Sequence, residues 1–112
     1  MDDVTQKTLK RALEAPGTKH LVVCDHRSQA VDELKDVAWK VSECRLNYLD
    51  MMCELPNGSR LYFMTDTDRN AIMGICFSTI AFLAPVADTK PYLVRLRERG
   101  CLEPMYFTKG EE

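Results

Sequence analysis

The sequence lacks an excess of either charge and lacks any long apolar run. Its 112 residues include 15 Lys and Arg against 17 Asp and Glu, for a formal net charge of -2. This balance excludes the strongly basic composition of an obligate nucleic-acid binder, so any contact with nucleic acid is expected to be local. The longest apolar stretch, Ala81–Ala87, contains Pro85 and is too short to span a bilayer, and residues 1–11 show no secretion signal. We expect a cytoplasmic protein that does not insert into membranes.

The cysteines form no C-x-x-C pair, and neither His20 nor His26 has a metal-ligand spacing to them. This pattern argues against a structural zinc site, and no cofactor is expected. Most of the cysteines lie in apolar stretches, which favours free buried thiols in a reducing compartment over a disulfide framework. The five are Cys24, Cys44, Cys53, Cys76 and Cys101.

The overall composition is that of a globular protein. Apolar residues make up 46% of the chain and charged residues 29%, which sets aside disordered and low-complexity classes. The length is near the usual size of one domain, roughly 100–150 residues. We predict a single α/β domain over residues 1–112, in which residues 109–112 form a frayed tail.

Helix-like and strand-like patterns alternate in the first half of the chain. Apolar residues at helical spacing predict a helix over Thr5–Ala15, ended by Pro16. The run His20–Asp25 is apolar without alternation, as in a strand that is covered on both faces. A second helix is predicted from a cap at Ser28 to about Val41.

A β-hairpin is the clearest local prediction. Asn57-Gly58 separates two strand-like segments, Leu49–Leu55 and Arg60–Thr65. Asn-Gly is typical of a tight turn in which both residues adopt positive φ angles. The first segment is expected to add to the sheet as an antiparallel strand.

The second half of the chain continues the alternation. A short helix is predicted over Arg69–Met73, a last helix that runs through Arg99, and an edge strand at Met105–Thr108. Strands that alternate with helices favour a layered α/β fold with a mainly parallel sheet and flanking helices. The strands expected to be central, buried and mutually parallel are Leu21–Asp25, Arg60–Thr65 and Thr79–Leu83.

Three segments resemble parts of a known fold family. They are LVVCDHRSQA at 21–30, NGSRLYF at 57–63 and STIAFLA at 78–84. In this order, and with a helix before the first, they resemble the middle of a P-loop NTPase core of the phage terminase or superfamily-2 helicase kind. The resemblance covers about residues 6–85 and implies a sheet whose phosphate loop would open the first helix.

The motifs that give such cores their activity are incomplete. Lys7-Thr8 matches the end of a phosphate loop, but Met1 and Gln6 stand where its two glycines belong. Ala84-Pro85 stands where an acidic Walker B pair is needed to help hold Mg²⁺. The resemblance therefore implies a degenerate core that does not hydrolyse nucleoside triphosphates, with weak nucleotide binding at Lys7 and Thr8 as one hypothesis.

A second hypothesis concerns polar residues that follow two of the predicted parallel strands, at the edge where open α/β sheets bind ligands. The candidate metal ligands there are Asp25, His26, Asp66 and Asp68. Together they could hold a divalent metal for chemistry on phosphate esters, with Arg27 or Arg69 neutralising an anion. The alternative is that these residues cap helices and face solvent.

We favour a third hypothesis, a non-catalytic protein that binds a protein or nucleic-acid partner. The candidate contact residues are Arg27, Arg69, Arg95 and Arg99. The last two share a helix face, although the negative net charge favours a solvated face over a stripe that binds phosphates. The resemblance alone implies a virus-encoded accessory or inhibitor protein in the host cytoplasm.

Overall fold

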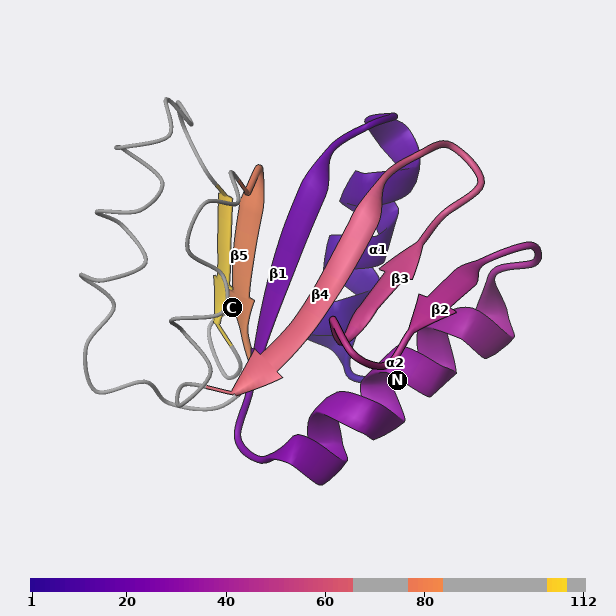
Figure 1. Ribbon diagram of the computed structural model, residues 1–112. Helices are drawn as coiled ribbons and strands as arrows, with labels where there is room; N and C mark the ends of the chain where they lie inside the picture. The colour runs from indigo at the N-terminus through magenta and orange to yellow at the C-terminus, as the bar shows by residue number, and fades with distance from the viewer. Residues whose placement is uncertain (66–76, 84–104, 109–112) are drawn as a thin grey trace.

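The fold is a layered α/β structure, described by a computed structural model for residues 1–65, 77–83 and 105–108 (Figure 1). The elements are α1 (Asp3–Glu14), β1 (Lys19–Cys24), α2 (Arg27–Lys40), β2 (Arg45–Asn47), β3 (Met52–Glu54), β4 (Arg60–Thr65), β5 (Thr79–Phe82) and β6 (Met105–Thr108). The described strands form one sheet in the order β2-β3-β4-β1-β5-β6. Neither α1 nor α2 is long and apolar enough to cross a membrane.

The centre of the sheet is parallel, as predicted. Strand β1 lies between β4 and β5 and is parallel to both, and β6 extends the parallel part beyond β5. Strands β2 and β3 add on the other side in antiparallel orientation. The predicted strand at Leu49–Leu55 is confirmed only over the residues of β3. The predicted helix at Arg69–Met73, the last helix and the tail lie outside the described residues.

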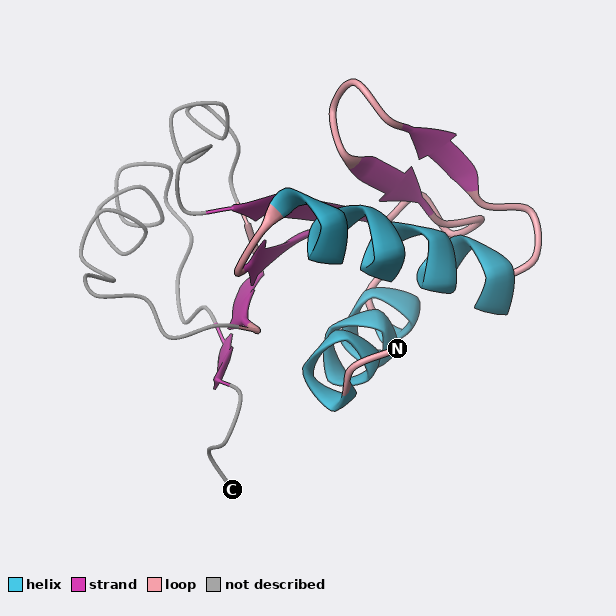
Figure 2. Cartoon of the chain, turned by 90° about the horizontal axis from the view of Figure 1, so that it is seen from below, coloured by secondary structure: helices cyan, strands magenta, loops and turns pink. Residues whose placement is uncertain are grey.

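Strand β1 has no alternation because both of its faces are buried. Figure 2 shows both described helices on one face of the sheet, and Val22 and Cys24 pack in the cluster that includes residues of both helices. Leu21 and Val23 pack into a second apolar cluster on the opposite face. All four side chains are at most 2% exposed. An apolar run without alternation is the pattern expected for a parallel strand covered on both faces.

The start of α2 corrects the sequence prediction of a cap at Ser28. The N-cap is His26, whose Nδ1 accepts a hydrogen bond from the Gln29 N–H at 3.1 Å. Ser28 already lies within the helix, and its hydroxyl lies 2.6 Å from the same Nδ1. The N-cap acceptor is here an imidazole nitrogen, where a Ser or Asp oxygen is usual. The usual preference for Ser therefore predicted the cap two residues after its actual position.

The hairpin forms where it was predicted, but its turn is of another kind. Gly58 has a φ of +86°, whereas Asn57 is not among the residues with positive φ. The Gly58 N–H donates to the Leu55 carbonyl at 3.0 Å, and Leu55 and Ser59 face each other through a backbone hydrogen bond of 2.8 Å. This is the pattern of a three-residue loop that ends in a left-handed glycine. The prediction that both residues take positive φ was wrong.

The Asn57 side chain serves a different purpose, because it caps the C-terminus of α1. Its Nδ2 donates to the Ala12 carbonyl at 2.8 Å, and its Oδ1 accepts from the Ser59 N–H at 3.0 Å. The Ser59 hydroxyl lies 2.9 Å from the Ala12 carbonyl and 2.8 Å from the Ala15 carbonyl. The last carbonyls of a helix lack partners within the helix, so the hairpin supplies them from a distant part of the chain.

Replacing Ser59 with Ala should therefore destabilise the protein by about 0.5–1.5 kcal/mol, because it removes a buried hydroxyl donor from the end of α1, while Asn57 and Thr18 still donate to the Ala12 and Ala15 carbonyls. Ser59 is fully buried. The free energy of unfolding, measured in urea, tests this. Ser78→Ala is the matched control, because Ser78 is exposed, and it should change stability by less than about 0.5 kcal/mol. Equal stability of the two variants would contradict the cap.

Candidate functional site at the carboxyl edge of the sheet

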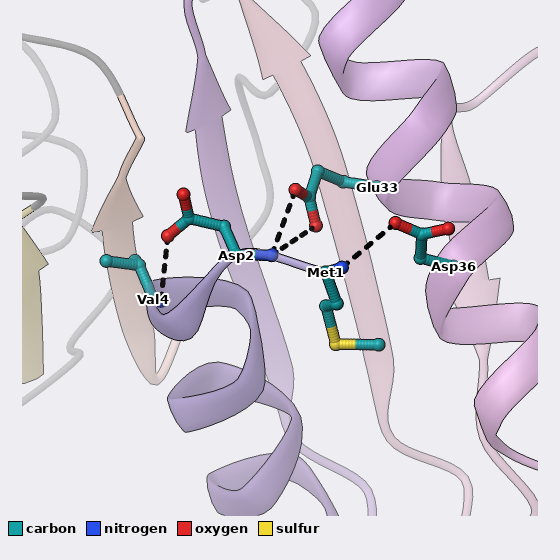
Figure 3. Close-up of polar contacts among 5 residues, drawn as sticks. All are labelled: Met1, Asp2, Val4, Glu33 and Asp36. Carbon is teal, nitrogen blue, oxygen red and sulfur yellow. Dashed lines mark hydrogen bonds and ion pairs between the residues drawn. The ribbon is translucent and has the colours of Figure 1, made fainter.

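The N-terminus of α1 contacts the middle of α2 near the edge where the parallel strands end. The Asp2 N–H donates to both oxygens of the Glu33 carboxylate, at 3.1 and 3.3 Å, as Figure 3 shows. The Asp2 carboxylate caps α1 by accepting from the Val4 N–H at 3.0 Å. The Met1 ammonium group lies 3.3 Å from the Asp36 carboxylate. Two residues of α2 thus anchor the start of α1.

This edge carries negative charge close to the first helix. Asp2, Glu33 and Asp36 bring three carboxylates to the start of α1, and the Met1 ammonium group offsets the charge of only one of them. The pKa of the Cys24 thiol, at the end of β1, is raised to about 12. Burial is the main cause, and the negative charges of Glu33 and Asp2 contribute less. A phosphate group would be repelled here, and one of the backbone amides that it would need is already bonded to Asp2.

Lys7 and Thr8 do not lie at the start of α1. The helix begins at Asp3, so they occupy its second turn. Thr8 is fully buried and its hydroxyl donates to the Val4 carbonyl at 2.9 Å, whereas Lys7 is exposed. In a phosphate loop the two side chains face one phosphate and its Mg²⁺. Here they point to different environments, which disfavours nucleotide binding at this pair.

The polar residues that follow β1 are exposed and serve the start of α2. The Asp25 N–H donates to the Gln29 side chain at 2.8 Å, and the His26 Nδ1 is occupied by the cap. Only the Nε2 of His26 is left to bind a metal. Within residues 1–65, 77–83 and 105–108, no three His, Cys, Asp or Glu side chains lie close enough to hold a metal ion. The other proposed ligands, Asp66 and Asp68, lie outside the described residues.

Of the four arginines proposed to contact a partner, the structure places one. Arg27 is the first residue of α2 and is exposed at the carboxyl edge. Arg69, Arg95 and Arg99 lie outside the described residues. Whether the four form one surface therefore stays a prediction.

The structure adds exposed apolar side chains that the sequence analysis did not single out. Trp39, in the last turn of α2, is 93% exposed, and Leu49 is 97% exposed. Leu49 lies in a turn closed by Asn47 and Asp50, where the Asp50 N–H donates to Asn47 Oδ1 at 3.1 Å. One signal was available for Trp39. It follows Val37 by two residues, about 200° around the helix, so it had to face away from the core.

A buried histidine, His20, lies near the amino end of the central strand β1, away from the carboxyl edge. His20 is 1% exposed, with Nε2 2.6 Å from the Thr18 hydroxyl and Nδ1 2.7 Å from the Thr79 hydroxyl. Thr18 donates its proton to the Ala15 carbonyl, so Nε2 carries the hydrogen and Nδ1 accepts from Thr79. Burial lowers the pKa of His20 to about 4. Both ring nitrogens are therefore satisfied within the protein, and the residue is structural.

Comparisons with known protein families, with curated proteins and with solved structures found no match. The resemblance to a degenerate P-loop core therefore stays a prediction that depends on the sequence segments quoted for it.

Proposed function

We propose that this chain is a non-catalytic protein that acts by binding another protein, with the exposed side of α2 around Trp39 as its contact surface. The observation that carries the proposal is Trp39, which is 93% exposed. Tryptophan is enriched among the residues that dominate protein interfaces, because a large amphipathic ring gains much when it is desolvated. Leu49 and the half-exposed Tyr48 are further exposed apolar side chains, on the turn after β2.

The residues that could take part in catalysis have structural roles, which supports a binding function over catalysis. His26 caps a helix, Thr8 is bonded within the core, and Glu33 anchors the start of α1. Each has a structural partner that explains its position without a substrate. A P-loop-like core without working motifs, as the resemblance implies, also fits an accessory or inhibitor protein encoded by a virus.

The charges on α2 favour a protein partner over nucleic acid. The exposed basic residues Arg27, Lys35 and Lys40 alternate with Asp32 and Asp36 along the same helix. Nucleic-acid binding requires positive charge that tracks successive phosphates. A mixed surface around one large apolar residue is more typical of a protein interface, which has an apolar centre and a polar rim.

Replacing Trp39 with Ala should weaken partner binding about 30-fold, which corresponds to a loss of about 2 kcal/mol. Stability should change by less than about 0.5 kcal/mol, because the side chain is exposed. The complex is purified with wild-type protein from native extract, and the dissociation constant of the identified partner is then measured for both proteins.

Lys10→Ala is the matched control, because Lys10 is exposed on α1 and lies outside the proposed surface. It should leave the affinity unchanged. The proposal fails if Trp39→Ala retains wild-type affinity. It also fails if the protein binds polynucleotide instead, with a salt-dependent affinity that Arg27→Glu lowers and Trp39→Ala does not.

A further inference from the structure

Two cysteines lie together at the edge of the sheet, on the face covered by the helices. Cys53 of β3 is paired with Leu46 of β2, and Cys44 precedes Leu46 by two residues. Residues two apart along an extended chain point to the same face, so Cys44 and Cys53 are diagonal neighbours. Both pack in the same apolar cluster, and each thiol lies close enough to affect the pKa of the other.

The two thiols are not equivalent. Cys53 is completely buried, whereas Cys44 is half-buried and reaches the surface beside the short edge strand β2. Burial, with a smaller contribution from the neighbouring Cys44 thiol, raises the pKa of Cys53 to about 12. Burial also raises the pKa of Cys44, and the neighbouring Cys53 thiol offsets part of that rise. Cys44 is therefore the thiol that ionises first and that solvent reaches first.

We propose that Cys44 and Cys53 form a modification site, at which a peroxide oxidises Cys44 and Cys53 then closes a reversible disulfide. The Cys44 thiolate attacks one peroxide oxygen, the O–O bond breaks, and hydroxide leaves while Cys44 becomes a sulfenic acid. The Cys53 sulfur then attacks the Cys44 sulfur, the S–O bond breaks, and the oxygen leaves as water with the Cys53 proton. In total two thiols and one hydrogen peroxide give one disulfide and two waters.

The position of the pair in the fold makes closure feasible. Strand β2 has three residues and pairs on one side only within the described sheet, with β3. Glu43, next to Cys44, has a φ of +65°, which is unfavourable for a residue other than glycine. A short edge strand beside a strained residue can shift by the small distance that a disulfide requires. The closed loop would contain the turn that carries Tyr48 and Leu49.

The test is to treat the folded, fully reduced protein with hydrogen peroxide and to map the disulfides by mass spectrometry. The expected product has lost two free thiols, contains a peptide linking Cys44 to Cys53, and returns to the reduced form with a dithiol. Cys53→Ala should instead accumulate a sulfenic acid at Cys44 that dimedone traps. Cys24, which is buried with its pKa raised to about 12, should stay reduced in the same sample and serves as an internal control.

Three results would overturn the proposal. One is that Cys44 and Cys53 both remain reduced while the peroxide oxidises methionines of the same molecule. Another is that Cys44 becomes linked to Cys76 or Cys101. The third is that Cys24 is oxidised as fast as Cys44. All three are read on the wild-type protein, so they do not depend on whether a variant folds.

Discussion

Replacing Val22 with Asp should strongly destabilise the protein and lower its melting temperature. Val22 is fully buried in β1, which lies between β4 and β5. An aspartate there would place an unpaired carboxylate against the core between the sheet and the helices. The expected cost exceeds about 4 kcal/mol, which is a large part of the roughly 5–15 kcal/mol that stabilises a domain of this size.

Phe82→Asp tests the other face of the sheet, where Phe82 is 4% exposed, and it should have a similar effect. Leu49→Asp is the matched control, because it introduces the same charge at a position that is 97% exposed. It should change stability by less than about 0.5 kcal/mol. Thermal unfolding followed by circular dichroism separates these cases. If Val22→Asp melts at the temperature of Leu49→Asp, β1 is not buried on that face.

Acidification should destabilise the protein through His20. Burial lowers the pKa of the folded-state imidazole from 6.5 to about 4. Between these values the unfolded chain binds the proton and the folded protein does not. The stability from a neutral His20 is thus complete above pH 6.5 and is lost as the pH falls toward 4. The slope reaches at most about 1.4 kcal/mol per pH unit, and the total loss is about 3 kcal/mol.

The measurement is the free energy of unfolding in urea between pH 8 and pH 4, for the wild type and for His20→Gln. The variant cannot titrate at this position, so its stability should fall less steeply over the same range. The carboxylates are the same in both proteins, and their contribution cancels in the difference between the two curves. Parallel curves would show that His20 takes up its proton at the same pH in the folded and unfolded protein, contrary to its burial and its contacts with Thr18 and Thr79.

Elements whose apolar pattern reflects burial could be predicted from the sequence. Elements that depend on particular contacts with distant residues could not. The apolar run of β1 reflects a strand covered on both faces, and that pattern is visible in any window of the chain. Strand β2 has three residues, which is too short for a pattern. The turn at Asn57 follows from its bond to Ala12, 45 residues away in the chain, which local turn preferences do not contain.

The candidate site was harder to predict because helix caps, metal ligands and phosphate contacts use the same residue types. Asp25-His26-Arg27 has the composition of a ligand site, and the structure shows His26 in a cap. Lys7-Thr8 has the end of a phosphate-loop motif, but helix periodicity places Thr8 on the buried face with Leu9 and Ala12. Periodicity could have revealed both this and the outward position of Trp39.

The proposed binding of a protein partner through the surface around Trp39 is tested most directly by photo-crosslinking. A benzophenone side chain is placed at position 39 and, as the control, at position 10 on the exposed side of α1. Irradiation in native extract should join the first protein to one discrete protein partner and leave the second without that product. The same products from both positions, or a crosslink to nucleic acid alone, would contradict the claim.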